Sequence, residues 1–235
     1  MVSSPSRCEK EEMTKTPIVF LVYKRLKETQ KAFESIRRAK PESLFVVSDG
    51  PKDKEEEKKT MEVQRFINES IDWKCNLRWN ASTANMGLSQ RVSSGISWAF
   101  EHCCRAIILE DDCVADPTFF RYCEELLKKY ELNPKVGCIT GNNFQDGKTR
   151  GKASYYFSDF PHCWGWATWK RSWNEYDHSL NCWEKASKQI GRKYGTKTLD
   201  HWHLLKRKVE AGELDSWAFR WTFSLWAKQM LTVTP

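Results

Sequence analysis

Ala106-Ile107-Ile108-Leu109-Glu110-Asp111-Asp112 places three carboxylates directly after a run of four apolar residues. A short, continuous apolar run is typical of a strand that is buried on both faces of a parallel sheet. Ligands of open α/β sheets bind at the carboxyl ends of the strands, which is where these acids stand. An acidic triplet alone indicates only a solvated turn, but its position after a buried strand favours a binding site.

The three carboxylates cannot all bind one ion, because adjacent residues of an extended chain point in opposite directions. Mg²⁺ or Mn²⁺ typically takes one or two carboxylates and completes its shell with substrate phosphates. One division of roles that fits places a metal on Asp112, a ribose hydroxyl on Asp111, and supporting or base contacts on Glu110.

Strands and helices alternate on both sides of this stretch. We predict strands at 18–23, 44–47, 75–79 and 136–140, and helices at 28–39, 54–71, 88–100 and 117–130. Met61 and Leu88 are expected on the buried faces of their helices. Repeated β-α units favour an α/β domain with a mostly parallel sheet. After Gly141 we predict a short strand at 155–157, helices at 170–176, 183–211 and 217–228, and the start of a strand at 231–235.

Length and composition limit the class of protein. The 235 residues suit one large domain or two small ones, and we expect 1–16 to be a disordered leader. The net charge of +7 comes with lysines and glutamates interleaved at 52–59, which argues against nucleic-acid binding. No apolar run reaches the ~18 residues of a membrane helix, and no signal peptide is apparent. We therefore expect a cytoplasmic protein whose nine cysteines are reduced thiols.

Tryptophan is concentrated in the last third of the chain, with nine of the twelve residues at or after Trp164. The segment 161–169 is too rich in aromatic rings for routine packing. Flat rings beside a few polar groups are typical of a sugar pocket, and Gly165 would allow a close backbone approach. About half of these tryptophans are expected in the core instead.

Other strand ends and turns carry candidate ligand-binding residues. The turn 85–87 opens a helix and suits an anion, which Arg91 could reach with its guanidinium fork. A plain turn with a surface arginine explains the same residues equally well. Asp49 ends the second strand and could accept a hydrogen bond from a base or a ribose, although an aspartate there is also a common turn-former.

Taken together, these motifs resemble a known family. In chain order they are Tyr23-Lys24-Arg25, Ser48-Asp49-Gly50, Asn85-Met86-Gly87-Leu88, Arg91, Ile108-Leu109-Glu110-Asp111-Asp112, Gly141-Asn142-Asn143-Phe144, Ser154-Tyr155-Tyr156-Phe157-Ser158 and Pro161-His162-Cys163-Trp164-Gly165-Trp166-Ala167-Thr168-Trp169. The chain resembles the nucleotide-diphospho-sugar glycosyltransferases of GT-A fold, and within them the family-2-like and haemolytic-protein-like members, from about Pro17 to Pro235. This implies a Rossmann-like, mostly parallel sheet flanked by helices, with a nucleotide-sugar-binding half at 17–145 and an aromatic-rich acceptor half at 146–235.

The resemblance also implies a substrate class and site residues. The donor would be a nucleotide sugar, often a UDP-sugar, held with Mn²⁺ or Mg²⁺, and the acceptor a glycan or another hydroxyl compound. Asp112 would bind the metal. The donor would contact Tyr23, Arg25, Asp49, Arg91, Glu110 and Asp111, and the acceptor Trp164, Gly165, Trp166 and Trp217. The resemblance also favours a transfer that inverts the configuration of the anomeric centre.

Two departures from the family pattern stand near the end of the chain. Relatives carry an acidic residue directly after a tryptophan as the general base, whereas Ala218 follows Trp217 here. Asp215 is the substitute, although helical geometry would point it elsewhere. Relatives also continue to a histidine that completes the metal site, so the chain is expected to be truncated or one module of a longer protein. The alternatives are a catalytically impaired module that binds a sugar nucleotide or a glycan, and a nucleotidyltransferase, although residues 23–31 lack the glycine-rich loop of the latter.

Overall fold

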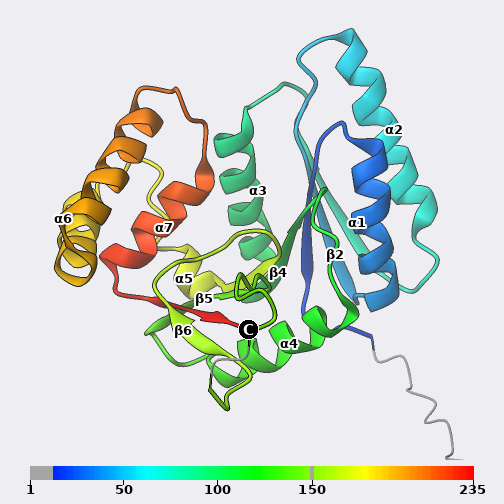
Figure 1. Cartoon of the computed structure of the whole chain (residues 1–235). Helices are drawn as coiled ribbons and strands as arrows, with labels where there is room; N and C mark the ends of the chain where they lie inside the picture. Colours follow the sequence, from blue (N-terminus) through cyan, green and yellow to red (C-terminus); the bar gives the residue numbers. More distant parts are fainter. Residues whose placement is uncertain (1–12, 149–150) are drawn as a thin grey trace, which may run out of the picture.

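The computed structural model describes residues 13–148 and 151–235 (Figure 1). Its centre is one eight-stranded sheet in the order β3-β2-β1-β4-β7-β5-β8-β6. The strands are β1 (Ile18–Val22), β2 (Ser43–Ser48), β3 (Asn76–Ala81), β4 (Arg105–Glu110), β5 (Val136–Thr140), β6 (Tyr156–Ser158), β7 (Trp166–Trp169) and β8 (Leu231–Thr234). The predicted strands are therefore all present, with ends that differ by one or two residues.

Strand direction decides where the site forms. β1, β2, β3, β4, β5 and β8 run parallel, whereas β6 and β7 run opposite to them. β7 is inserted between β4 and β5 and pairs antiparallel with both. The chain that enters β7 therefore lies at the carboxyl ends of its two neighbours. This brings Trp164 and Gly165 to the same edge of the sheet as the acidic triplet. The strand directions confirm the predicted α/β fold with a mostly parallel sheet.

Helices cover both faces of the sheet (Figure 1). They are α1 (Leu26–Ala39), α2 (Lys54–Ser70), α3 (Leu88–His102), α4 (Pro117–Lys129), α5 (Lys170–Trp173), α6 (Trp183–Glu210) and α7 (Trp217–Ala227). Alternate residues of β1 face opposite layers: Ile18 and Phe20 belong to the core shared with α1, α2 and α4, whereas Val19 and Leu21 belong to the core shared with α3 and α7. The period of two is the expected geometry of a strand that is covered on both faces.

Helix α6 differs from the single helix predicted at 183–211. Gly195 has φ 80° and ψ 177°, so two helical pieces meet at this residue. Glycine reaches positive φ without the steric clash of a Cβ atom, which explains why the interruption falls there. α6 packs against α7 in a third apolar cluster that includes Ile190, Phe223 and Trp226.

Three sequence predictions need correction. Met61 and Leu88 are 57% and 51% exposed, because the buried stripe of α2 runs through other positions and Leu88 opens α3 at the surface. The leader predicted at 1–16 is wrong for its last residues: Thr14 N–H donates to Ala39 O at 3.1 Å, and Thr16 N–H donates to Glu124 Oε1 at 3.0 Å. Residues 1–12 lie outside the described residues.

The eight cysteines in the described residues are all free thiols, in agreement with the expectation of reduced cysteines. Most are buried or half-buried, and burial raises the pKa of the Cys103 thiol to about 11. Within the described ranges, no helix combines the length and apolar character that crossing a bilayer requires.

Candidate functional site

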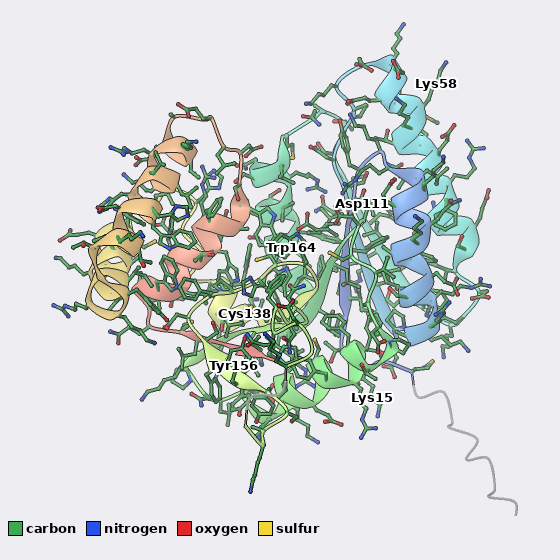
Figure 2. All side chains as sticks on the ribbon, viewed as in Figure 1. Lys15, Lys58, Asp111, Cys138, Tyr156 and Trp164 are labelled. Carbon is green, nitrogen blue, oxygen red and sulfur yellow. The ribbon has the colours of Figure 1, made fainter. Side chains whose placement is uncertain are left out.

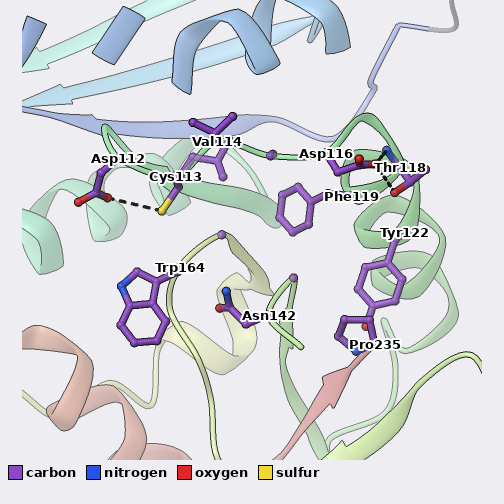
Figure 3. Close-up of a pocket in the computed structure, with 14 residues that line it drawn as sticks. Asp112, Cys113, Val114, Asp116, Thr118, Phe119, Tyr122, Asn142, Trp164 and Pro235 are labelled. Atoms are coloured by element: carbon purple, nitrogen blue, oxygen red, sulfur yellow. Dashed lines mark hydrogen bonds between the residues drawn. The ribbon is translucent and has the colours of Figure 1, made fainter. Parts of the chain in front are cut away.

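Two cavities open at the carboxyl ends of the parallel strands, one on each side of the acidic triplet. The smaller cavity has a volume of about 370 Å³ and contacts Glu110 and Asp111. The larger cavity has a volume of about 810 Å³ and contacts Asp112 (Figure 3). The triplet therefore divides its carboxylates between two spaces. The division is not the strict alternation of an extended chain, which would group Glu110 with Asp112, because β4 ends at Glu110 and the next two residues form a turn. Figure 2 labels Asp111, which follows β4, and Trp164, which precedes β7.

The smaller cavity collects the candidate donor residues. They come from the ends of β1, β2 and β4 and from the start of α3, and they are Tyr23, Arg25, Asp49, Arg91, Glu110 and Asp111. Asp215, which precedes α7, lines the same cavity. The structure thus brings the predicted donor-binding residues and the candidate base into one space, although their sequence positions span most of the chain.

The acidic triplet is bound by one arginine. Arg25 Nη2 forms an ion pair with Asp111 and donates to Asp112 Oδ2 at 2.9 Å, and Arg25 Nε donates to Asp111 Oδ2 at 3.3 Å. Asp111 is only 4% exposed, and burial raises its pKa in spite of Arg25. Burial, together with repulsion from Asp112 and Asp111, raises the pKa of Glu110 to about 7. The triplet is therefore an acidic site that one arginine does not neutralise.

Asp112 is the exposed member of the triplet and stands at one end of the larger cavity (Figure 3). The described residues contain no group of three His, Cys, Asp or Glu side chains that could hold a metal ion. A divalent cation here would need oxygen ligands from a bound substrate. That fits Mg²⁺ and Mn²⁺, which are commonly held by one or two carboxylates together with phosphates.

Asp49 fixes the turn after β2. Its Oδ1 accepts hydrogen bonds from the backbone N–H groups of Gly50 and Met86, both at 2.9 Å, and its Oδ2 accepts from Asn85 Nδ2 at 3.1 Å. A Cβ atom on Gly50 would lie 2.4 Å from the carbonyl carbon of Ala84, so only glycine fits between the two turns. Asp49 therefore forms the turn, which was one of its two interpretations from the sequence. Its carboxylate also lies beside the smaller cavity.

Arg91 is buried and bonded to the protein. Its Nε donates to Ser48 O at 3.1 Å, and its Nη2 donates to the backbone oxygen and to the side-chain Oδ1 of Asn80, the latter at 2.7 Å. Burial lowers the pKa of this guanidinium. Arg91 therefore connects α3 to the ends of β2 and β3. The alternative interpretation, in which Arg91 is a surface residue after a plain turn, is wrong.

Tyr23 belongs to a network at the end of β1. Its hydroxyl donates to Glu56 Oε2 and accepts from Asn85 Nδ2 at 3.0 Å, while Lys24 forms an ion pair with Glu56. The hydrogen bond from Lys24, followed by that from Tyr23, lowers the pKa of Glu56 to about 2. This network holds α2 against the rim of the smaller cavity.

The low pKa of Glu56 predicts a pH-dependent contribution to stability. It should be fully present above the ordinary carboxyl pKa of 4.5 and should be lost as the pH falls towards about 2, because the folded state prefers the ionised form. Glu56→Gln removes the titration. The unfolding free energies of the two proteins, measured by urea denaturation at a series of pH values, should differ at neutral pH and converge at about pH 2. A difference that stays constant over this range would contradict the prediction.

Asp215 does not follow helical geometry, because α7 begins only after its cap residue Ser216. Its Oδ1 accepts a hydrogen bond at 3.1 Å from the backbone N–H of Ser89, in the first turn of α3. A carboxylate from a distant part of the chain thus caps the start of α3, where the sequence predicted an anion site. The expectation that Asp215 points elsewhere is wrong, and the sequence carries no signal for this long-range contact.

The candidate acceptor tryptophans separate into two environments. Trp164 is 63% exposed and lines the larger cavity together with Gly165, which has φ +78°. Trp166 and Trp217 are 0% and 3% exposed, and their rings stack at 5.5 Å between centroids inside the core of α3 and α7. The two buried rings offer no surface to a ligand, because Trp166 of β7 and Trp217 of α7 pack against each other inside this core.

Sequence reasoning missed several residues of the larger cavity. Phe119 and Tyr122 of α4, Asn142 after β5, and Pro235 after β8 contribute to its wall (Figure 3). The only available signal was the position of the segment 141–144 directly after a buried strand. The role of α4 depends on tertiary packing that no local pattern encodes.

Comparison with solved structures identifies the fold, whereas comparison of sequences finds no match. No protein-family model matches the chain, and no curated protein matches it in sequence. Among solved structures it is similar to the mannosyltransferase PcManGT from Pyrobaculum calidifontis in complex with GDP-Man and Mn²⁺, with a TM-score of 0.51, 12% identity, and coverage of 93% of this chain and 70% of that chain. This likeness shows a GT-A-like, Rossmann-type α/β fold.

Two further solved structures are more distant. A 4-diphosphocytidyl-2C-methyl-D-erythritol synthase from Anaerococcus prevotii has a TM-score of 0.40 and 12% identity over 86% of each chain. A UDP-glucose pyrophosphorylase complexed with UDP-glucose has a TM-score of 0.35 and 11% identity over 68% of this chain and 70% of that chain. TM-scores this low support no argument about this protein.

Proposed function

We propose that the protein is a metal-dependent glycosyltransferase that moves a sugar from a nucleoside-diphosphate donor, with UDP-sugars the first candidates, to a hydroxyl group of a glycan, with inversion. The observation that carries the proposal is the pair of cavities that meet at the acidic triplet of a GT-A-like fold. The smaller cavity would take the nucleoside and the larger one the acceptor, so that the diphosphate lies beside Asp112.

The residues of the smaller cavity suit a nucleoside. Asp111 is a buried carboxylate that can accept from a ribose hydroxyl, and Asp49 with Asn85 forms a polar edge that can face a base. Asp112 would hold the divalent cation together with the donor phosphates, and Arg25 orients its carboxylate. A cation in this place supplies Lewis-acid stabilisation of the charge that develops on the departing diphosphate.

Asp215 is the proposed general base. It lines the smaller cavity, whereas Ala218, at the position that carries the acid in relatives, lines neither cavity. The cap on α3 engages Oδ1, so Oδ2 is the oxygen that would take the proton from the acceptor hydroxyl. Because the acceptor is assigned to the larger cavity, this assignment requires its reacting hydroxyl to extend past the acidic triplet into the smaller cavity, on the side of α7.

Asp215→Asn separates the two roles of this residue. Asparagine keeps an oxygen for the Ser89 N–H but cannot act as a base at neutral pH, so transfer should fall about 10²- to 10⁴-fold while donor affinity and stability change little. Asp215→Ala, which also removes the cap, should lose a further ~1 kcal/mol of unfolding free energy. Full transfer activity in the asparagine variant would remove Asp215 from the mechanism.

A second candidate function is a module that binds a sugar nucleotide or a glycan without turnover, which the alanine at position 218 favours. A panel of UDP- and GDP-sugars, incubated with and without MnCl₂, distinguishes the two. Manganese-dependent release of the nucleoside diphosphate supports the transferase. Saturable binding in calorimetry without release supports the binding module.

A further inference from the structure

Three aromatic rings contact one another outside the core, and one of them, Trp164, lines the larger cavity. The Phe144 ring lies 4.8 Å from that of His162 and 6.1 Å from that of Trp164, measured between centroids, and both contacts are edge-to-face. Phe144 is 58% exposed and Trp164 is 63% exposed. Large rings that contact each other and remain exposed stand out on a protein surface, and such patches commonly mark binding sites.

The backbone that carries these rings is firmly held. Thr140 is fully buried, and its hydroxyl donates to His162 O at 2.8 Å and accepts from the Asn142 N–H at 3.2 Å. Asn143 Nδ2 donates to Pro235 O at 2.8 Å. The loop after β5 and the loop before β7 are thereby joined to each other and to β8. A site on anchored backbone loses less conformational entropy when a ligand binds.

The chemistry of the patch selects against charged and purely apolar ligands. Burial lowers the pKa of His162, which disfavours a positive charge on this patch. The wall of the cavity that Trp164 lines carries the polar side chains of Asp112, Asp116 and Asn142, which a lipid chain would remove from water without adding a hydrogen bond. A neutral ligand with an apolar face and a polar rim fits both conditions. A pyranose ring has this form, since its C–H face packs on aromatic rings and its hydroxyls need polar partners.

We propose that Phe144, His162 and Trp164 form a carbohydrate subsite that binds a sugar ring of the glycan acceptor, beyond the unit that receives the transferred sugar. The identity of the ligand as an acceptor rests on the proposed glycosyltransferase function. The volume of about 810 Å³ stands in the upper part of the usual range of about 300–1,000 Å³ for ligand sites. It leaves room for more than one sugar ring, so a disaccharide acceptor would fit.

Saturation-transfer NMR and calorimetry with defined sugars test the subsite. The probes are the methyl glycosides of glucose, mannose, galactose and N-acetylglucosamine, and disaccharides of the same units. At least one disaccharide should bind more tightly than its monosaccharide, and Phe144→Ala should weaken that binding about 3- to 10-fold. Phe157→Ala is the matched control, because Phe157 is a similarly accessible ring, 47% exposed, that lies on β6 and contacts the rings of Tyr130 and Tyr155 instead of those of the proposed subsite.

The outcomes separate this subsite from the proposed function. Binding of UDP with MnCl₂ should be the same in wild type, Phe144→Ala and Phe157→Ala. Intact donor binding with no sugar binding in wild type, or with sugar binding that Phe144→Ala leaves unchanged, overturns the subsite and leaves the transferase standing. Sugar binding that depends on Phe144 in a protein that binds no nucleotide keeps the subsite and removes the transferase. Thermal unfolding of each variant verifies that the exposed substitution leaves the fold intact.

Discussion

Asp112→Ala is expected to abolish the manganese-dependent part of UDP or GDP binding, with a loss of affinity of roughly 100-fold or more. Asp112 is the member of the acidic triplet that faces the larger cavity, and the described residues offer no cluster of protein ligands that could hold the cation without a substrate. A cation held by one or two carboxylates and the donor phosphates depends strongly on each carboxylate. Nucleotide binding without metal should change little.

Asp116→Asn provides the matched control for this measurement. Asp116 lines the same cavity but accepts hydrogen bonds from the N–H and hydroxyl of Thr118 as the cap of α4, a role that asparagine can also fill. Isothermal titration calorimetry of UDP in the presence and absence of MnCl₂ should show a normal metal effect in Asp116→Asn. A normal metal effect in Asp112→Ala would show that the cation binds elsewhere and would remove the proposed site.

Trp166→Ala is expected to lower the free energy of unfolding by about 3–5 kcal/mol. The side chain is fully buried, and its ring contacts those of Trp173, Trp217 and Trp221 at 5.5–6.0 Å between centroids. Removing it leaves a large void between the sheet and the helices α3 and α7, which the surrounding rigid rings cannot fill. Urea denaturation monitored by circular dichroism measures the free energy of unfolding of the variant and of the wild type.

Trp164→Ala, two residues before Trp166, is expected to leave the free energy of unfolding almost unchanged. This indole is 63% exposed, so its loss should change the free energy of unfolding by no more than about 0.5 kcal/mol. The comparison tests the division of the tryptophan-rich segment into a structural part and a ligand-facing part. Equal destabilisation by both substitutions would contradict that division.

The sequence predicted every strand except β7 (Trp166–Trp169), because the other buried strands are short, apolar and bounded by turns, whereas β7 lies inside a tryptophan-rich segment that was interpreted as a sugar pocket. It also predicted that the acidic triplet ends β4, since an apolar run that turns abruptly polar marks a strand end. What it could not predict is which tryptophan is buried. Trp164 and Trp166 have the same composition around them, and only the insertion of β7 between β4 and β5 separates them.

Long-range polar contacts were equally inaccessible. The capping of α3 by Asp215 joins residues that are 126 positions apart, and the ion pair of Arg25 with Asp111 spans 86 positions. No local period or propensity encodes such pairs. Arg91 shows the same limit: the sequence suggested a guanidinium near an anion, and the structure gives it the backbone and side-chain oxygens of Asn80 instead.

The bond between Asn143 and Pro235 has a practical consequence for any assay. Pro235 forms part of the wall of the larger cavity (Figure 3), and its carbonyl oxygen anchors the loop that carries Phe144. A shift of the backbone at Pro235 would therefore alter the region where we expect glycans to be captured. A purification handle at the amino terminus leaves this residue undisturbed in ligand titrations.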